Sequence, residues 1–313
     1  MPRDMGRFFR LLQGVLGAFA FGVSLSALAN EVFVIHKGGE AAQAQLLEKL
    51  ERELGAGVHV TQHALPADGD ATAPALPAGV DLVVTLGVDA ARTYLAAGYE
   101  TPLLAVMVPR LAYLGLQEVR PRKLKLTAVF IDQPLVRQLE LIRAVLPAAR
   151  RIGVVQGPAT ADAVADLERL AQDKGLTLVS HPAARDTELY PALQDVLQSA
   201  DALLALPDPI IVNAATAQNL LLTSFKYRKP VFGYSAAYVR AGALASVYST
   251  PAQIGETAAQ RIRELLAARG GAEPIYPRHF SVAVNRALAA SLGLQIPDDA
   301  KLMESMQRLE PRR

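Results

Sequence analysis

The chain has 313 residues and a formal net charge of +2, with 32 lysine and arginine residues against 30 aspartate and glutamate residues. The basic residues are dispersed, and their main cluster, residues 120–125, is typical of a solvated loop, so we expect no nucleic-acid partner. The sequence contains no cysteine, which excludes disulfides, thiol nucleophiles, cysteine metal ligands and a lipid on an N-terminal cysteine.

The first 29 residues have the pattern of a secretory signal peptide. Three arginines precede an apolar run over Leu11–Leu25, and Ala27 and Ala29 place small residues where a signal peptidase cuts. We expect cleavage after Ala29. The alternative, a retained membrane anchor, needs about 20 apolar residues, and this run is shorter. An exported chain without cysteine is most simply a free periplasmic protein, and the remaining length favours two lobes.

Short runs rich in valine, isoleucine and leucine recur along the rest of the chain, separated mostly by stretches with apolar residues three and four apart. Continuous apolar strands are typical of parallel sheets covered by helices on both faces. The pattern predicts an α/β fold of two doubly wound, parallel-sheet lobes. The predicted strands are Val32–Ile35, Val58–Gln62, Asp81–Leu86, Leu103–Val108, Leu126–Phe130, Arg151–Val155, Leu176–Ser180, Ala202–Leu206, Val231–Phe232, Leu244–Tyr248 and Phe280–Val284. The clearest predicted helices are Glu40–Leu54, Pro134–Leu146, Ala161–Lys174 and Asn213–Tyr227.

Local signals suggest where the chain changes lobe. The first change is predicted near residues 128–130, after a polar stretch that contains proline. Residues 233–242, rich in glycine, alanine, serine and tyrosine, are expected to cross between the lobes as a hinge. Thr250-Pro251-Ala252-Gln253 is a capping box that begins a helix, which we expect to pack on the first lobe. The predicted first lobe comprises residues 30–128 and about 243–275, the second comprises residues 129–242 and about 276–297, and residues 298–313 form a C-terminal tail.

An ordered series of motifs occupies the region from Phe130 to Leu266. It consists of Leu141–Pro147 (LIRAVLP), Arg151–Val155 (RIGVV), Leu206–Ile211 (LPDPII), Pro230–Ser235 (PVFGYS) and Val239–Leu244 (VRAGAL). Through these motifs the chain resembles the ABC-transporter substrate-binding proteins of the type that includes tryptophan- and phenylalanine-binding members.

The resemblance implies a type I periplasmic-binding-protein fold in which a small-molecule ligand binds in the cleft between the lobes. It further implies delivery of the ligand to an ABC permease in the inner membrane. The family expectation for the ligand is an aromatic amino acid or a related metabolite. In one place the chain departs from many relatives, which have Gly-Thr-Pro-Ala-Ala where this sequence has Gly87–Ala91 (GVDAA).

Ligands of open α/β sheets bind beyond the carboxyl ends of the strands, and that rule selects candidate residues in the first lobe. His36 begins a turn with two glycines, whose free backbone N–H groups suit an anion, although an ordinary tight turn is the alternative. Gly87 and Asp89 follow the third predicted strand. Asp89 serves equally well as a negative charge in the first turn of a helix.

The second lobe supplies further candidates by the same rule. Asp208, held between two prolines, is the strongest polar candidate, and a turn-forming aspartate is its alternative. Gln156 follows a predicted strand. The aromatic rings of the hinge either contact the ligand or pack the hinge, and its arginine either binds a carboxylate or joins the lobes by a salt bridge. These hinge candidates are Tyr234, Ser235, Tyr238 and Arg240.

Asp132 precedes a predicted helix and is expected mainly to cap it, with ligand contact as the alternative. Arg137, one turn further along, is expected to be exposed.

Catalytic and metal-binding patterns are not found. The five histidines have no metal-ligand spacing, and neither a nucleophile elbow nor a dinucleotide fingerprint occurs. We therefore expect a monomeric binding protein without cofactor or metal. Three functions stay open at this point: a solute-binding protein serving an ABC importer, a sensing module that reports to a membrane receptor or kinase, and an enzyme on a two-lobed scaffold.

Overall fold

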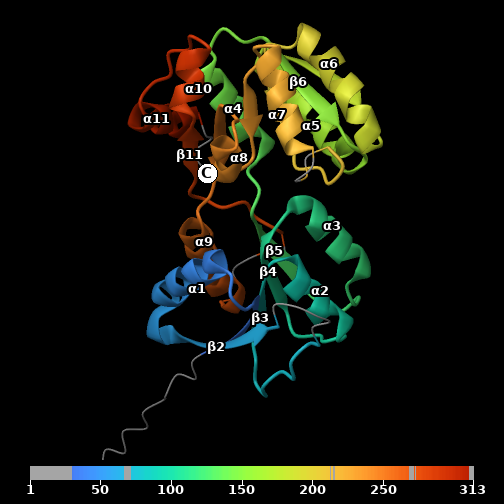
Figure 1. Ribbon diagram of the computed structural model, residues 1–313. Coiled ribbons are helices and arrows are strands. Elements are labelled where there is room, and N and C mark those ends of the chain that lie inside the picture. The colour runs from blue at the N-terminus through green and yellow to red at the C-terminus, as the bar shows by residue number, and fades with distance from the viewer. Residues whose placement is uncertain are drawn as a thin grey trace, which may run out of the picture.

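The computed structural model describes residues 30–66, 72–211, 213, 216–267, 271 and 273–309. Two α/β lobes lie one above the other in Figure 1, joined by connecting segments. The predicted signal peptide lies outside the described residues.

The first lobe is built on a five-stranded sheet in which all strands are parallel, in the order β2-β1-β3-β4-β5. Helices α1 and α9 cover one face of the sheet, and α2 and α3 cover the other (Figure 1). The inner strands are continuous apolar runs because both of their faces are buried. The strands are β1 (Asn30–Lys37), β2 (Val58–Leu65), β3 (Leu82–Leu86), β4 (Leu103–Val108) and β5 (Leu126–Phe130). The helices are α1 (Ala41–Leu54), α2 (Val88–Ala96), α3 (Arg110–Val119) and α9 (Pro251–Leu266).

The second lobe has a six-stranded sheet in the order β11-β10-β9-β8-β6-β7, parallel except for β11, which pairs antiparallel with β10. One apolar core lies between this sheet and α4, α5, α10 and α11, and another lies beneath α6, α7 and α8. Its strands are β6 (Arg151–Gln156), β7 (Thr177–Pro182), β8 (Ala202–Leu204), β9 (Val231–Gly233), β10 (Ala245–Tyr248) and β11 (Ser281–Val284). Its helices are α4 (Leu135–Val145), α5 (Ala161–Asp173), α6 (Leu189–Ser199), α7 (Ala217–Lys226), α8 (Ala236–Arg240), α10 (Arg286–Ser291) and α11 (Asp299–Leu309). The predicted fold class, two doubly wound lobes with largely parallel sheets, is confirmed.

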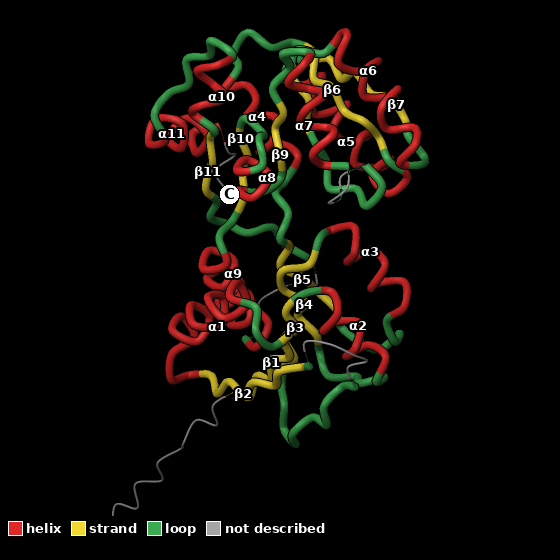
Figure 2. The backbone as a smooth tube through the Cα atoms, viewed as in Figure 1, coloured by secondary structure: helices red, strands yellow, loops and turns green. Residues whose placement is uncertain are grey.

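Three segments connect the lobes, and we call them the crossings. The first, residues 131–134, leads from β5 to α4; the second, residues 249–250, leads from β10 to α9; the third, residues 276–280, leads to β11. Figure 2 shows the crossings as loops between the two sheets. Ile275 pairs with Val129 beside β5, so the third crossing begins at the edge of the first sheet.

The helix predicted from the capping box forms as expected. The Thr250 hydroxyl accepts a hydrogen bond from the Gln253 backbone N–H (3.2 Å), and the Gln253 side-chain oxygen accepts one from the Thr250 backbone N–H (2.9 Å). The helix, α9, packs against α1 of the first lobe. Contact is close at Gly255, where a Cβ atom would lie 2.6 Å from the Leu46 carbonyl oxygen. A glycine at this position therefore lets the two helix backbones approach.

The prediction that residues 233–242 cross between the lobes was wrong. This segment forms the end of β9, then α8, and leads to β10, and all three belong to the second lobe. The Tyr238 ring packs directly on Gly233. A Cβ atom at this position would lie 2.5 Å from Tyr238 Cδ1, so the packing requires glycine. The chain leaves the second lobe only at residues 249–250, so residues 243–248 belong to the second sheet and not to the first lobe.

The described part of the predicted C-terminal tail contains an integral helix, α11. In α11, Leu302 and Met306 are 0% and 1% exposed and belong to the same core as α4. Their spacing of four residues places them on one face of the helix, and that face completes the second lobe.

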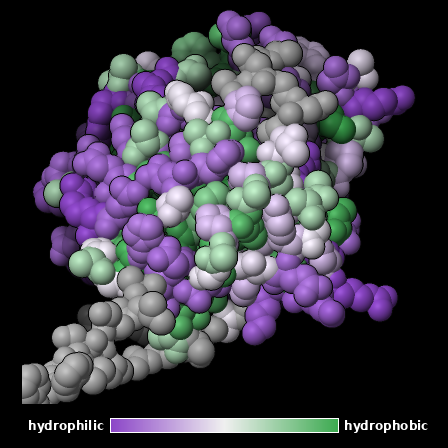
Figure 3. All heavy atoms as spheres, turned by 90° about the horizontal axis from the view of Figure 1, so that it is seen from below, coloured by the Kyte–Doolittle hydropathy of each residue, from purple (hydrophilic) through white to green (hydrophobic). Residues whose placement is uncertain are grey.

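Among the described residues, no helix has both the length and the apolar character needed to cross a membrane. Figure 3 shows the molecule from below, on the first lobe. Hydrophilic side chains cover the left of this face, on the side of α1, and hydrophobic ones lie mainly toward the middle.

Candidate ligand-binding site

A cavity of about 800 Å³ lies at the junction of the lobes, and we call it the cleft. The first lobe contributes the start of α3, and the second lobe contributes α4, α5 and the loops that follow β8 and β9. All three crossings also reach its wall. A cavity of this size accommodates a small organic molecule. Because its walls belong to different lobes, a ligand in the cleft contacts both.

The position of the cleft follows from the topology of the two sheets. Pro109 comes directly after β4, the pair Ala159 and Thr160 comes shortly after β6, and Tyr234 comes directly after β9. Carboxyl ends of parallel strands from both lobes therefore meet at the cleft, as the rule for open α/β sheets predicts.

Asp132 connects the first crossing to the first lobe. Its carboxylate oxygen Oδ2 accepts a hydrogen bond from the backbone N–H of Arg110 (2.5 Å), the first residue of α3. Burial raises the pKa of the Asp132 carboxyl, and the bond and charge of Arg110 act in the opposite direction. Both side chains line the cleft, together with Leu111 and Leu114 of α3, which are 40% and 43% exposed. The first-lobe wall thus combines apolar surface with a half-buried carboxylate.

Three tyrosines line the cleft: Tyr234 after β9, Tyr248 at the end of β10 and Tyr276 in the third crossing. Burial raises the pKa of Tyr234 and of Tyr276. For Tyr276, the positive charge of Arg110 partly offsets that rise, and the negative charges of Asp132 and Asp166 add to it. Groups from the first lobe, the first crossing and α5 therefore act on one phenol in the cleft.

Helix α5 presents a charged face to the cleft. Asp162, Asp166, Arg169 and Asp173 line it, at spacings of four, three and four residues that keep them on one side of the helix. Asp166 and Arg169 form an ion pair within the helix. Together with Asp132 and Arg110, the lining contains four carboxylates and two guanidinium groups. Among the described residues, no group of three histidine, aspartate or glutamate side chains is placed to hold a metal ion.

A network of hydrogen bonds ties the crossings together. The Gln133 side-chain amide donates to the Ser249 hydroxyl (2.8 Å), which donates to the His279 carbonyl oxygen (2.6 Å). Arg137 on α4 donates both to the Gln133 side-chain oxygen (2.9 Å) and to the Pro277 carbonyl oxygen (2.8 Å). The first, second and third crossings are thus linked through buried polar groups.

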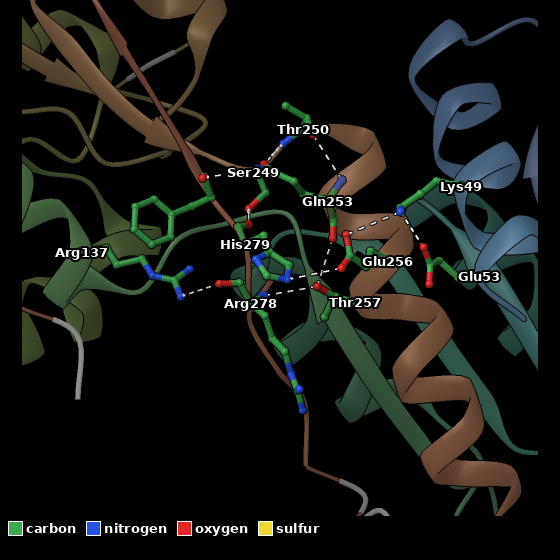
Figure 4. A network of polar contacts seen from close by, with 11 residues as sticks. Lys49, Glu53, Arg137, Ser249, Thr250, Gln253, Glu256, Thr257, Arg278 and His279 are labelled. Atoms are coloured by element: carbon green, nitrogen blue, oxygen red, sulfur yellow. Dashed lines mark hydrogen bonds and ion pairs between the residues drawn. The ribbon is translucent and has the colours of Figure 1, made fainter. Parts of the chain in front are cut away.

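Figure 4 shows how this network continues onto the first lobe. His279 lies 3.4 Å from Glu256 of α9, and Glu256 lies 3.8 Å from Lys49 of α1. The prediction that Arg137 is exposed was wrong: it is 8% exposed, and its guanidinium lies 4.6 Å from the centre of the Phe280 ring. Its position beneath the third crossing explains the burial.

Asp208 has a structural position in the loop after β8. It is 2% exposed, and its carboxylate accepts hydrogen bonds from the backbone N–H groups of Ile210 (2.9 Å) and Ile211 (3.2 Å) and from the Thr160 hydroxyl (3.3 Å). Gly157 lies directly against it, since a Cβ atom there would be 2.1 Å from Asp208 Oδ2. The geometry matches the turn-forming alternative, because these bonds occupy both carboxylate oxygens.

Besides Asp132, the candidate residues that the structure places on the cleft wall are Tyr234 and Ser235. The Ser235 hydroxyl also caps α8 by accepting from the Tyr238 backbone N–H (3.2 Å). Tyr238 is 6% exposed and lies behind Tyr234, with ring centres 5.3 Å apart. Burial raises its pKa, and its hydroxyl has no hydrogen-bond partner within the described part of the chain. Tyr238 therefore supports the ring that faces the cleft.

The remaining candidates do not line the cleft. His36 is the second-last residue of β1, and Gly87 follows β3; both lie at the same end of the sheet as Pro109 but further from the crossings. Gly87 has a φ of +85°, which favours glycine at the start of α2. Asp89 is an exposed residue in the first turn of α2, the helix-charge alternative. The other two are Gln156, the half-buried last residue of β6, and Arg240, the exposed last residue of α8.

Sequence reasoning missed much of the cleft wall. The sequence pattern does not predict α3, so it does not point to Leu111 and Leu114 of that helix as cleft residues. Tyr248 was assigned to a strand only, and Tyr276 lies in a segment without a recognisable element. The rule for strand ends does select Pro109 and Arg110, which follow the fourth predicted strand, and both line the cleft.

Comparison with known families gives one match. Residues 75–305 match the model of a family described as ABC transporter substrate binding protein. No protein of curated function matches the sequence.

Solved structures share the two-lobed fold. A conserved domain protein from Vibrio cholerae is 21% identical, with a TM-score of 0.56, over 88% of this chain and 98% of that chain. A domain from Streptococcus pneumoniae in complex with L-Trp is 19% identical, with a TM-score of 0.56, over 88% and 98%. A ligand-free, open substrate-binding protein with adhesive properties from Clostridium difficile is 15% identical, with a TM-score of 0.65, over 86% and 97%. At these identities the likeness shows the fold alone.

Proposed function

Because this chain belongs to the ABC transporter substrate-binding protein family, we propose that it captures a small molecule in the cleft and delivers it to an ABC permease. The family is one of binding proteins rather than enzymes. The observation that carries the proposal is the cleft itself, a cavity of about 800 Å³ whose walls come from both lobes and all three crossings. A ligand that contacts both walls stabilises the closed arrangement by binding it more tightly than the open one.

The cleft supports a ligand with an aromatic or other apolar body. Tyr234, Tyr248 and Tyr276 offer large rings with polar tips, and Leu111 and Leu114 add exposed apolar surface on the opposite lobe. An aromatic amino acid or a related metabolite fits this wall. These side chains support the proposal, because the L-Trp complex is too distant in sequence to identify the ligand.

The location and assembly follow from the same function. A protein that serves an ABC importer works in the periplasm, which agrees with the signal-peptide pattern of residues 1–29 and with cleavage after Ala29. We propose that the mature protein is monomeric, since each copy holds a complete cleft, and that it takes neither cofactor nor nucleic acid.

The proposal is tested by recovering the natural ligand. Small molecules released from the natively purified protein are identified by mass spectrometry, and X-ray scattering is measured with and without the recovered compound. We expect a smaller radius of gyration with the compound, and a stabilisation of about 2.7 kcal/mol at a ligand concentration one hundred times Kd. Superimposable scattering curves, or recovery of the compound chemically changed after incubation, would contradict the proposal.

A matched pair of variants ties binding to the cleft. Ala163 lines the cleft on α5, whereas Ala165, two residues along the same helix, is exposed and lies outside the lining. Ala163→Trp should fill the cavity and abolish binding, and Ala165→Trp should bind as the unmodified protein does. Equal affinity in both variants would place the ligand elsewhere.

A further inference from the structure

The charged groups around the cleft are unequally distributed. Its lining contains four carboxylates and two guanidinium groups, and one of those guanidinium groups, Arg169, is already paired with Asp166. That pair is exposed and lies within one helix, so it contributes little stability and a ligand cation can compete for Asp166. The cleft therefore has a net negative charge before a ligand enters.

Two of the carboxylates lie on opposite sides of the cleft. Asp132 is held to the first lobe by its hydrogen bond from the Arg110 backbone N–H, and Asp166 projects from α5 of the second lobe. Asp132, Asp166 and Tyr276 all line the cleft, so both carboxylates border the same space. Closure brings these like charges closer together, and their repulsion opposes it unless a positive charge lies between them.

The lining also has an acceptor that needs a donor. Gln138 of α4 lines the cleft and is 6% exposed, and its side-chain oxygen accepts no hydrogen bond from the described residues. Burial of an unpaired acceptor is unfavourable. A ligand group rich in N–H donors matches both this oxygen and the carboxylates, and an ammonium group carries three such donors and a positive charge.

We propose that the cleft recognises a cationic group of its ligand, of the ammonium class, through Asp132 and Asp166 beside Tyr276, while the tyrosines hold an apolar body. This inference rests on the proposed function and adds the ligand chemistry to it. The ammonium bridges the two lobes and replaces the repulsion between the carboxylates with attraction to both. A carboxylate on the ligand is not required, although Arg110 offers a place for one.

The proposal is tested by calorimetry on the mature protein at pH 7 with two series of probes. Within each series the aromatic ring is the same and the group that carries or lacks a charge changes. The first series is 2-phenylethylamine, phenylalanine, N-acetyl-2-phenylethylamine and 3-phenylpropionate. The second is tryptamine, tryptophan, N-acetyltryptamine and indole-3-propionate. In at least one series we expect the compounds with an ammonium group to bind about tenfold or more tightly than the neutral and anionic ones. Equal or tighter binding of the propionates or N-acetyl compounds, or no binding in either series, overturns the proposal.

Variants locate the cation. Asp166→Asn and Asp132→Asn should each weaken binding of the tightest amine about tenfold or more. Asn at position 132 keeps an oxygen for the Arg110 N–H, so α3 remains capped. Glu168→Gln is the control. Glu168 is an exposed residue of α5 outside the lining, and its substitution removes the same charge from the same helix. Equal affinity in Asp166→Asn and Glu168→Gln refutes the assignment.

The pH dependence gives an independent readout. Arg110 on α3 donates its backbone N–H to Asp132. The other charged and titratable groups that line the cleft with Asp132 are Tyr234, Tyr248 and Tyr276 and, on α5, Asp162, Asp166, Arg169 and Asp173. The amine should bind more tightly as the pH rises and Asp132 ionises, and Asp132→Asn should weaken this dependence. A propionate that closes the lobes in scattering would leave the proposed function standing and refute the cation alone, whereas a recovered natural compound that leaves the lobes open would refute the function itself.

Discussion

The carboxylate of Asp132 accepts a hydrogen bond from the backbone N–H of Arg110, the first residue of α3. The sequence predicts that Asp132 caps the helix that follows it, α4, but that helix has Pro134 at its N-cap and no side-chain cap. Asp132 instead caps a helix that begins 22 residues earlier. One side chain therefore links the first crossing to the start of α3 and places a carboxylate in the cleft.

Removing this cap should destabilise the first lobe. Asp132→Ala leaves the backbone N–H of Arg110, the first of α3, without a side-chain acceptor, and loss of an N-cap costs about 1 kcal/mol. Asp132→Asn keeps an acceptor and should retain most of that stability. Urea denaturation of the ligand-free protein measures both, and equal free energies of unfolding for the two variants would argue against the capping role.

The stability of the protein should depend on the ionisation of Asp132. Burial raises its folded-state pKa above the ordinary value of 3.8. A raised carboxyl pKa contributes stability that is fully present below the unfolded-state value and is lost as the pH rises through the folded-state pKa. Relative to Asp132→Asn, the unmodified protein should therefore lose stability as the pH increases above about 4. Urea midpoints for the two proteins across this range check the sign, and parallel curves would contradict it.

The bond between the first and second crossings should be important for stability. Ser249→Ala removes the group that accepts from Gln133 and donates to His279, and it leaves buried polar atoms unpaired. We expect a loss of about 1–3 kcal/mol. Ser291→Ala is the control, since that serine is exposed at the end of α10 and bonds only within its helix. Chemical denaturation that shows the same free energy of unfolding for both variants would exclude a structural role of the network.

Asp208→Ala should affect folding more than binding. The change leaves the buried N–H of Ile211 and the half-buried N–H of Ile210 without acceptors, at a cost of about 2 kcal/mol. Binding of a cleft ligand to the folded protein should change little, because Asp208 lies outside the lining. Thermal unfolding and calorimetry separate the two effects. An unchanged melting temperature with lost affinity would restore Asp208 as a ligand contact.

Two glycines in helices should respond oppositely to alanine. At Gly255, an added Cβ meets the Leu46 carbonyl oxygen at 2.6 Å, so α1 and α9 must separate, at a cost of about 1–3 kcal/mol. At Gly115 of α3, no atom lies within 4 Å of the added Cβ, and alanine should stabilise the helix by up to about 1 kcal/mol. Free energies of unfolding that shift in the same direction would contradict the packing argument.

The sequence predicts the framework of this protein well, because strands buried on both faces have continuous apolar runs. All the β-strands of both sheets overlap a predicted strand within the described residues. The capping box at Thr250 also identifies the start of α9, since it depends on neighbouring residues alone. Such features depend on residues close together in the chain, so they can be predicted from the sequence.

The site is less predictable because its parts meet only in three dimensions. Tyr276 and Asp132 line the same cleft, although most of the second lobe and α9 lie between them in the sequence. Asp208 is conspicuous in the sequence between two prolines, but the hydrogen bonds that occupy it come from its own loop and from Thr160. The small residues near Gly233 resemble a hinge and instead accommodate the Tyr238 ring. The spacing of apolar residues indicates which positions are buried, but it does not indicate which buried side chain faces a ligand.

Helix α9 has a consequence for how the protein is made. It covers a face of the sheet that contains β1, yet a ribosome synthesises most of the second lobe before it reaches α9. Until Ile254 and Ile262 emerge, the strand residues Val32 and Val34 lack part of their apolar cover. Neither lobe can be completed from a continuous stretch of chain, because α9 of the first lobe precedes β11, α10 and α11 of the second, so both lobes reach their final packing only after these late segments have been synthesised.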